Sequence, residues 1–216
     1  MADDKFQKAI CGSTDAAAVT EFYDDWADTY EANLNAWDYQ APTDAALTLA
    51  GCLSADADIL DVGCGTGLFG KAIKNHLPCR LQGIDISPAS LDQARKTGLY
   101  ERLTCGDLQK TPLPFATGAF AAAACVGVMT YIEDAAALLA ELCRVVRTDG
   151  YILFTQRDDR WQQRGFDNLM ADFEVRHLWR SCQISQPRPY MPKHKTYAGT
   201  IQVIHVLCQV EGPVSG

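Results

Sequence analysis

The residues with the clearest chemical potential are three glycines and an acid in the first third of the chain. The run Asp61-Val62-Gly63-Cys64-Gly65-Thr66-Gly67 follows the apolar residues Ile59 and Leu60 and precedes a segment with helical spacing. Glycines permit a tight turn and let a ligand approach the backbone. The N–H groups at a helix N-terminus then attract polar ligand atoms. The pattern predicts a ligand-binding turn over residues 61–67.

Asp85 lies twenty residues after Gly65, at the end of the next strand-like segment. A carboxylate in that place can accept hydrogen bonds from both ribose hydroxyls of an adenosine. A glycine turn between a strand and a helix, followed by an acid at this distance, indicates an adenosine-containing cofactor.

The loop itself distinguishes between cofactors. A dinucleotide turn reads G-x-G-x-x-G, but here Leu68 takes the third glycine position and Gly67 comes one residue early. Asp61 beside the turn would repel a pyrophosphate, whereas it suits an ammonium or sulfonium group. The loop favours S-adenosylmethionine over NAD, and a nicotinamide-dependent oxidoreductase is the alternative.

Five segments resemble the motifs of class I S-adenosylmethionine-dependent methyltransferases. Residues 59–67 resemble the first motif, residues 83–87 the second, and residues 105–108 the segment that meets the adenine. Residues 113–128 resemble the fourth-strand motif, while residues 148–150 keep only the last glycine of the usual proline-glycine-glycine turn. Residues 22–30 and 98–103 are similar to one branch, the Williams–Beuren-region methyltransferase-like proteins. The resemblance covers about residues 16–155.

The resemblance implies S-adenosylmethionine as cofactor, S-adenosylhomocysteine as product, and a set of cofactor-binding residues. Around the methionine end it places Asp61, Gly63, Gly65, Thr66, Gly67 and the backbone of Cys125. It places Asp85 and Ile86 at the ribose, Asp107 and Leu108 at the adenine, and Tyr23 and Tyr30 over the cofactor as a cover. Simpler interpretations stay open: core packing for the two tyrosines, and turn or cap roles for Asp61 and Asp107.

Elements of alternating type must position these residues. Helical spacing runs from residue 16 to 53, with a second helical run over 44–52 that Pro42 and Thr43 open. Further helices are predicted over 71–77, 88–98, 133–147 and 161–173. Strands are predicted over 58–62, 80–85, 103–105, 119–126 and 151–155, with extended segments over 177–185 and 199–210. The run Ala121–Ala124 favours a helix by propensity, but its place in the alternation favours a buried strand.

The alternation predicts an α/β fold with a parallel sheet covered on both faces. With the resemblance, we expect a single doubly wound Rossmann-like sheet of seven strands, with residues 199–210 as an antiparallel last strand. Residues 1–53 are expected to form a helical lid on a core of residues 54–216, within one structural domain. We expect the first dozen residues to be poorly ordered.

The composition limits the cellular location and the binding partners that we expect for this protein. The net charge is −8 and no basic patch is present, which argues against nucleic-acid binding. No long apolar run and no signal-peptide pattern occur, which predicts a cytoplasmic protein without a membrane span. The nine cysteines include no C-x-x-C pair, so we expect reduced, mostly packed thiols and no metal site.

The sequence indicates less about the methyl acceptor than about the cofactor. Methyl transfer forces no particular catalytic residue, so none is assigned, and Tyr131, His177 and His194 are the only candidates. Residues 125–131 lack the prolines typical of enzymes that methylate nucleic-acid bases. We expect a small molecule or a protein side chain as methyl acceptor, and a monomer or homodimer. A catalytically silent cofactor-binding partner subunit is the second alternative.

Overall fold

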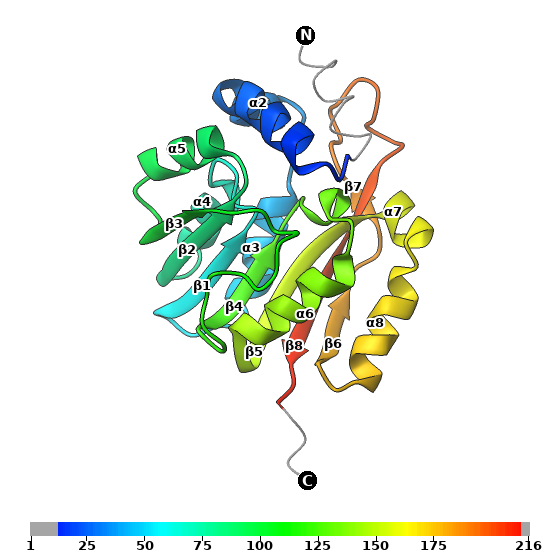
Figure 1. Cartoon of the computed structure of the whole chain (residues 1–216). Coiled ribbons are helices and arrows are strands. Elements are labelled where there is room, and N and C mark those ends of the chain that lie inside the picture. The colour runs from blue at the N-terminus through cyan, green and yellow to red at the C-terminus, as the bar shows by residue number, and fades with distance from the viewer. Residues whose placement is uncertain (1–12, 213–216) are drawn as a thin grey trace.

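The computed structural model describes residues 13–212 and has three layers, with one twisted sheet between two groups of helices (Figure 1). The strand order is β3-β2-β1-β4-β5-β8-β6, and the short β7 pairs with β8. Strands β1 to β5 are parallel to one another, whereas β8 runs antiparallel to β5 and to β6. The doubly wound α/β sheet and its antiparallel strand near the C-terminus are confirmed.

The strands and helices have the following bounds. The strands are β1 (Ala57–Val62), β2 (Cys79–Asp85), β3 (Arg102–Cys105), β4 (Phe120–Cys125), β5 (Val146–Arg157), β6 (Trp179–Ile184), β7 (Arg188–Pro189) and β8 (Gln202–Val210). The helices are α2 (Ala16–Ala36), α3 (Ala41–Ala50), α4 (Leu68–Lys74), α5 (Pro88–Lys96), α6 (Ala135–Val145), α7 (Asp158–Gln163) and α8 (Phe166–Val175), with a 3₁₀ turn at Met129–Tyr131.

The alanine-rich segment is strand β4 at the centre of the sheet, and every residue of it is buried. Its side chains alternate between two cores: Ala123 packs in the cluster under α6 and α8, and Ala122 and Ala124 pack in the cluster under α3 and α4. A strand buried on both faces needs no polar alternation. Tertiary position therefore decides this segment against its helix propensity.

Helix α2 crosses the carboxyl edge of the sheet above α5 (Figure 1). Asp24 accepts hydrogen bonds from the Ser87 hydroxyl at 2.6 Å and from the Ala89 N–H at 3.1 Å, at the start of α5. One turn further along α2, Asp28 accepts from Gln93 at 2.8 Å. These contacts fasten the N-terminal helix to the core.

Several element boundaries differ from the sequence predictions. The helical spacing over 16–53 is divided after Ala36, where Asp38 adopts a φ of 61°, and the second run predicted from Pro42 is α3, which begins at Ala41 and ends at Ala50. The helix predicted over 161–173 is two helices, because Gly165 turns the chain with a φ of 63°. Helix α4 starts at Leu68, three residues earlier than predicted. The proline-rich connection after β6 contains the two-residue β7, which pairs with β8 outside the predicted path of seven strands.

A further difference concerns residues 148–150, which were predicted as a turn before a strand. Helix α6 instead ends at Val145 and strand β5 begins at Val146. The pairing of β5 with β4 is irregular between Phe120 and Ala122, and Asp149 has a φ of 61° there. Residues 148–150 thus form a bulge within β5 instead of a separate turn before it.

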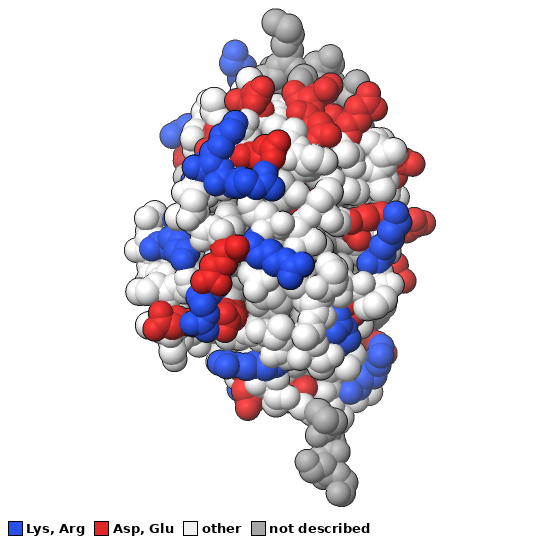
Figure 2. Space-filling view, turned by 60° about the vertical axis from the view of Figure 1, so that its left-hand side comes forward, with Lys and Arg blue, Asp and Glu red and all other residues white. Residues whose placement is uncertain are grey.

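Charge is distributed unevenly on the surface. On the face in Figure 2, acidic side chains gather at the end of the molecule that carries α2, while acids and bases are mixed elsewhere. Helix α2 contributes five acids: Glu21, Asp24, Asp25, Asp28 and Glu31. Within residues 13–212, no helix has the length and apolarity to cross a membrane. The expectation about the first dozen residues lies outside this range.

Candidate active site

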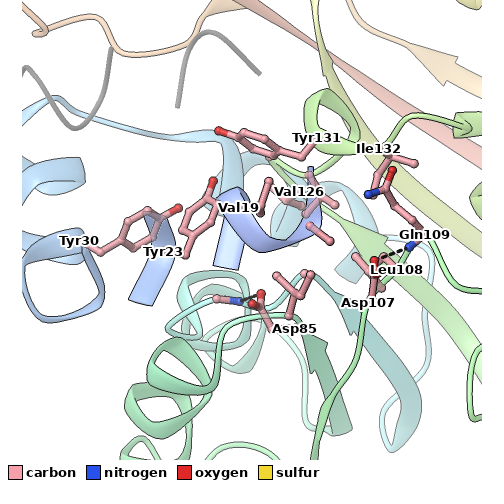
Figure 3. A pocket seen from close by; sticks show the side chains of 16 residues that line it. Val19, Tyr23, Tyr30, Asp85, Asp107, Leu108, Gln109, Val126, Tyr131 and Ile132 are labelled. Carbon is pink, nitrogen blue, oxygen red and sulfur yellow. Dashed lines mark hydrogen bonds between the residues drawn. The ribbon is translucent and has the colours of Figure 1, made fainter. Parts of the chain in front are cut away.

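A pocket of about 640 Å³ opens at the carboxyl ends of β1, β2 and β4. Its wall consists of residues from the glycine loop, the ends of β2 and β4, the segment after β3, and helix α2: Ala16, Val19, Tyr23, Tyr30, Gly63, Gly65, Asp85, Ile86, Asp107, Leu108, Gln109, Val126, Gly127, Val128, Tyr131 and Ile132. This is the place where ligands bind on open parallel sheets. In Figure 3, Asp85 lies at the floor, with Tyr23 and Tyr30 on one side and Leu108 and Gln109 on the other.

All three glycines of the loop have left-handed backbone angles, with φ of 69° at Gly63, 51° at Gly65 and 96° at Gly67. Side chains rarely adopt these angles, so the turn requires glycine. A Cβ at Gly63 would clash with the Val128 side chain, whereas a Cβ at Gly65 would meet nothing within 4 Å. The open side of Gly65 faces the pocket.

Asp85 holds the glycine loop in place. Its Oδ2 accepts the Gly65 N–H at 2.8 Å (Figure 3), and its Oδ1 accepts the Ser87 N–H at 2.9 Å. The side chain is buried, and burial raises the pKa of its carboxyl, while the backbone N–H donors oppose that rise. Each oxygen keeps acceptor capacity for a further hydrogen bond, so the carboxylate can still bind two hydroxyls.

Asp61 lies under the same loop but faces a smaller cavity of about 340 Å³ that adjoins the main pocket. Its Oδ2 accepts the Tyr100 hydroxyl at 2.6 Å. Burial raises the pKa of Asp61 to about 7, and the Tyr100 hydrogen bond works against that rise. Thr66 lines the same cavity, and its buried hydroxyl has no hydrogen-bond partner among the described residues.

The segment after β3 forms the far wall of the pocket. Asp107 accepts the Gln109 N–H at 3.0 Å, which closes a turn that presents Leu108 to the cavity. The Gln109 side chain donates to the Thr14 carbonyl at 2.8 Å and accepts the Glu133 N–H at 3.0 Å. Gln109 therefore ties the start of α2 to this wall.

Residues 60–154 match the model of a protein family that is described as a methyltransferase domain. Human methyltransferase-like protein 27 is 32% identical over 190 residues, which cover 80% of this chain and 77% of that protein. The chain belongs to the methyltransferases.

This methyltransferase is also similar to a second curated protein in sequence and to a solved structure in fold. Malonyl-[acyl-carrier protein] O-methyltransferase of Serratia marcescens is 34% identical over 113 residues, covering 49% of this chain and 43% of that protein. The structure of geranyl diphosphate C-methyltransferase from Streptomyces coelicolor, in complex with Mg²⁺, geranyl diphosphate and S-adenosyl-L-homocysteine, has a TM-score of 0.63 at 17% identity and 79% coverage of each chain.

The fold alone does not decide the reaction. The [4+2]-cyclase SpnF has a TM-score of 0.62 at 19% identity, with 79% of this chain and 80% of that chain covered. Folds of this kind carry many activities, so the assignment as a methyltransferase rests on the sequence relationships. These relationships give no support to the oxidoreductase or to the catalytically silent subunit.

Most of the predicted site residues of the methyltransferase meet in one place. The main pocket is lined by eight of them: Tyr23, Tyr30, Gly63, Gly65, Asp85, Ile86, Asp107 and Leu108. Asp61 and Thr66 line the adjoining cavity. Gly67 and Cys125 line neither: Gly67 packs against the Tyr100 ring, and the Cys125 sulfur is fully buried, 3.7 Å from the Met129 sulfur.

The three catalytic candidates separate clearly. Tyr131 lines the pocket, with its ring 5.7 Å from that of Tyr23. His177 is exposed and lies 3.4 Å from Glu211 near the C-terminal end of the chain. His194 is fully buried and its ring packs 4.6 Å from that of Trp37. Neither histidine lines either cavity.

Several pocket residues were missed by sequence reasoning. Val19 and Gln109 adjoin predicted positions and give no local signal of their own. Gly127 does carry one, because a glycine directly after a buried strand often marks a close backbone approach. Within residues 13–212, no cluster of three metal-binding side chains occurs, and all eight described cysteines are unpaired.

Proposed function

We propose that the main pocket and the adjoining cavity together bind S-adenosylmethionine. The observation that carries this proposal is Asp85, which is fixed by the Gly65 N–H at the floor of the pocket with acceptor capacity to spare. We assign Asp85 and Ile86 to the ribose, and Asp107 and Leu108 to the adenine.

The methionine end is assigned to the smaller cavity. The unpartnered Thr66 hydroxyl and the Asp61 carboxyl supply polar groups suited to an amino acid moiety. Gly65 leaves the backbone open there, because nothing lies within 4 Å of where its Cβ would be. Gly67 and Cys125 act indirectly in this proposal, through the shape of the loop and the position of β4.

The mechanism needs alignment and exclusion of water more than acid–base chemistry. When bound, S-adenosylmethionine supplies a methyl group that its sulfonium already activates. The described residues align an acceptor beside Gly127, while Tyr23 and Tyr30 from the lid cover the pocket. Aligning two reactants and excluding water lowers the barrier of a bimolecular displacement.

We further propose a small molecule or a protein side chain as acceptor, with oxygen as the atom methylated. Relatives named as O-methyltransferases support oxygen, and the acidic residues of α2 disfavour a nucleic acid. Residues 1–53 are proposed to act as the lid of the core over 54–216. We also propose that the protein acts in the cytoplasm, where cysteines such as the described unpaired ones stay reduced. We propose a monomer or a homodimer, and light scattering would distinguish the two.

The first test is thermal melting with S-adenosylhomocysteine, with NAD, and without ligand. S-adenosylhomocysteine at a hundred times its Kd stabilises a protein by about 2.7 kcal/mol. For a chain of 216 residues we expect a Tm increase of roughly 5–10 °C. Asp85→Ala should lose this increase, because the ribose hydroxyls then have no acceptor.

Asp92→Ala is the matched control, since Asp92 is an exposed acid on the outer side of α5. It should keep the full increase. An increase with NAD alone, or one that Asp85→Ala retains, would contradict the proposed site.

A further inference from the structure

A tyrosine that lines neither the main pocket nor the smaller cavity packs against the glycine loop. Tyr100 belongs to the connection between α5 and β3, and its ring lies 3.3 Å from where a Cβ of Gly67 would be. A Cβ at Gly70 would clash with the Tyr100 hydroxyl. Gly70 lies within helix α4, where glycine is less favourable than alanine. The two glycines therefore leave the space that the Tyr100 side chain fills.

The Tyr100 hydroxyl reaches one residue of the smaller cavity. It donates a hydrogen bond of 2.6 Å to Oδ2 of Asp61, which lies 39 positions earlier in the chain. Within residues 13–212, this is the one hydrogen bond that the Asp61 side chain accepts. Burial and the neighbouring Asp61 both raise the pKa of the Tyr100 hydroxyl, so it stays protonated and acts as the donor. Tyr100 thus contacts the cavity only through Asp61.

The Asp61 carboxyl has no cation beside it in the part of the chain that the structure describes. It is 2% exposed, and the charge that acts on its pKa is that of another acid, Asp85. The other described lining residues of the smaller cavity are uncharged: Tyr30, Tyr39, Pro42, Gly63, Cys64, Gly65, Thr66, Leu68, Phe69 and Val126. A buried carboxylate is unfavourable unless a cation or several donors compensate its charge. The cavity therefore favours a ligand that brings a positive charge to Asp61.

The hydrogen bond from Tyr100 prepares Asp61 for such a ligand in two ways. It favours the ionised carboxylate, because it lowers the pKa of Asp61 against the effect of burial. It also holds Oδ2, so that the carboxylate cannot turn freely and Oδ1 keeps its acceptor capacity for the ligand. A group that is already oriented loses less entropy on binding.

We propose that Tyr100 is a positioning residue, which holds the Asp61 carboxylate for the ammonium group of the cofactor's methionine end. This proposal rests on the proposed function, which assigns that end to the smaller cavity. Tyr100 contacts neither the cofactor nor the acceptor and acts through Asp61. Its hydroxyl therefore contributes to the affinity for ligands that carry the amino group, and not to the affinity for the adenosine portion.

Three ligands separate this role from general support of the glycine loop. S-adenosylhomocysteine carries adenosine, a thioether and the complete amino acid moiety. Its analogue without the amino group keeps the carboxylate, and 5′-methylthioadenosine lacks the amino acid moiety altogether. General support of the loop would affect all three ligands, since the loop borders the adenosine site as well. A role through Asp61 weakens the binding of S-adenosylhomocysteine alone.

The test is calorimetric titration of the full chain with each of the three ligands. Tyr100→Phe keeps the ring and removes the hydroxyl. It should raise the Kd of S-adenosylhomocysteine about tenfold, because the ammonium then meets a carboxyl that is less oriented and less readily ionised. The Kd of the analogue without the amino group and that of 5′-methylthioadenosine should not rise. Unweakened binding of 5′-methylthioadenosine also shows that the variant is folded.

A double-mutant cycle shows whether Tyr100 acts through Asp61. Asp61→Asn removes the carboxylate and should raise the Kd of S-adenosylhomocysteine about tenfold or more. When Asp61→Asn is present, Tyr100→Phe should have no further effect, since no carboxylate is left to orient. Tyr151→Phe serves as the control, because it removes a tyrosine hydroxyl from the amino-terminal half of β5 and should change none of the three Kd values.

Failure of the proposed function and failure of this proposal give different results. If the unsubstituted protein binds none of the three ligands, the proposed function is wrong, and the role of Tyr100 falls with it. If the unsubstituted protein binds S-adenosylhomocysteine, three results would overturn the role of Tyr100 alone. They are a Kd of S-adenosylhomocysteine that Tyr100→Phe leaves unchanged, equal weakening of all three ligands, and equal effects of Tyr100→Phe with and without Asp61→Asn.

Discussion

Asp61 retains its proton in a range where most aspartates have lost theirs, because it is 2% exposed beneath the glycine loop. Its pKa in the folded chain is about 7, against 3.8 in a free side chain. Between these values the folded protein binds a proton that the unfolded chain does not. Stability contributed by this proton is present below about pH 4 and is lost as the pH rises towards 7.

The resulting prediction concerns unfolding without ligand. Between pH 4.5 and 7.5, we expect Asp61→Asn to gain stability relative to the parent protein, by up to about 4 kcal/mol from three pKa units. Urea unfolding at five pH values gives the comparison. Taking the difference between the two proteins removes the contribution of Asp85, whose carboxyl is also shifted upward. A difference that does not change with pH would disprove the assignment.

Tyr100 provides a second prediction at this scale. Its hydroxyl donates to Asp61, and its ring lies 3.3 Å from where a Cβ of Gly67 would be. Tyr100→Phe removes a hydrogen bond that favours the ionised carboxyl, so the pKa of Asp61 should rise above 7. The pH at which stability stops falling should move upward in the same urea experiment, and an unchanged or lower value would count against the contact.

The site was predictable from sequence where its residues are close along the chain. The glycine loop and Asp85 follow a fixed spacing, since a strand, a turn and a helix must intervene. Tyr100 and Tyr39 could not be found in this way, because they reach the site from two separate loops, whereas the aromatic residues of the late region did point to Tyr190. Only the tertiary packing shows that Gly67 and Gly127 lie against these rings.

Helix α2 is attached to the core through its acids, and this attachment has a measurable role. Asp24 binds the start of α5, while Glu31 binds Lys71 of α4 at 2.6 Å. Asp24→Ala should loosen the helix that carries Tyr23 and weaken S-adenosylhomocysteine binding several-fold, because the cover must be ordered on binding.

The loss should appear in calorimetry as a less favourable entropy and in hydrogen exchange as faster exchange over α2. Glu21→Ala is the matched control, because Glu21 is an exposed acid on the same helix. Equal effects of the two substitutions would argue against a specific attachment.

Element boundaries were less predictable than element types. Helix α6 runs directly into β5 because Val146 is already buried against the core, which continues the chain as a strand where the sequence suggests a turn. Gly165 divides the last helical region through a backbone angle that no periodicity reveals. The order of helices and strands along the chain was predictable, because burial on both faces of the sheet constrains this order.

The whole molecule should unfold as one unit, since both helix layers share the same sheet. Phe154 lies at its centre, fully buried, with its ring 6.2 Å from those of Phe166 and Trp179. Phe154→Ala should destabilise the fold by about 3–5 kcal/mol and lower the Tm by roughly 6–20 °C. Val175→Ala, at a side chain that is 77% exposed, should stay within about 0.5 kcal/mol. Separate transitions for the lid and the core would contradict the single unit.

The position of β8 has a consequence for how the chain is made. This strand pairs with β5 on one side and β6 on the other, although it is synthesised after both. While the ribosome is still adding residues 202–210, β6 has no partner in the sheet and β5 has a bare edge. Until residues 202–210 have left the exit tunnel, the growing chain therefore exposes the unpaired edges of β5 and β6, which can pair with another chain. Slow translation of residues 202–210 would lengthen this exposure.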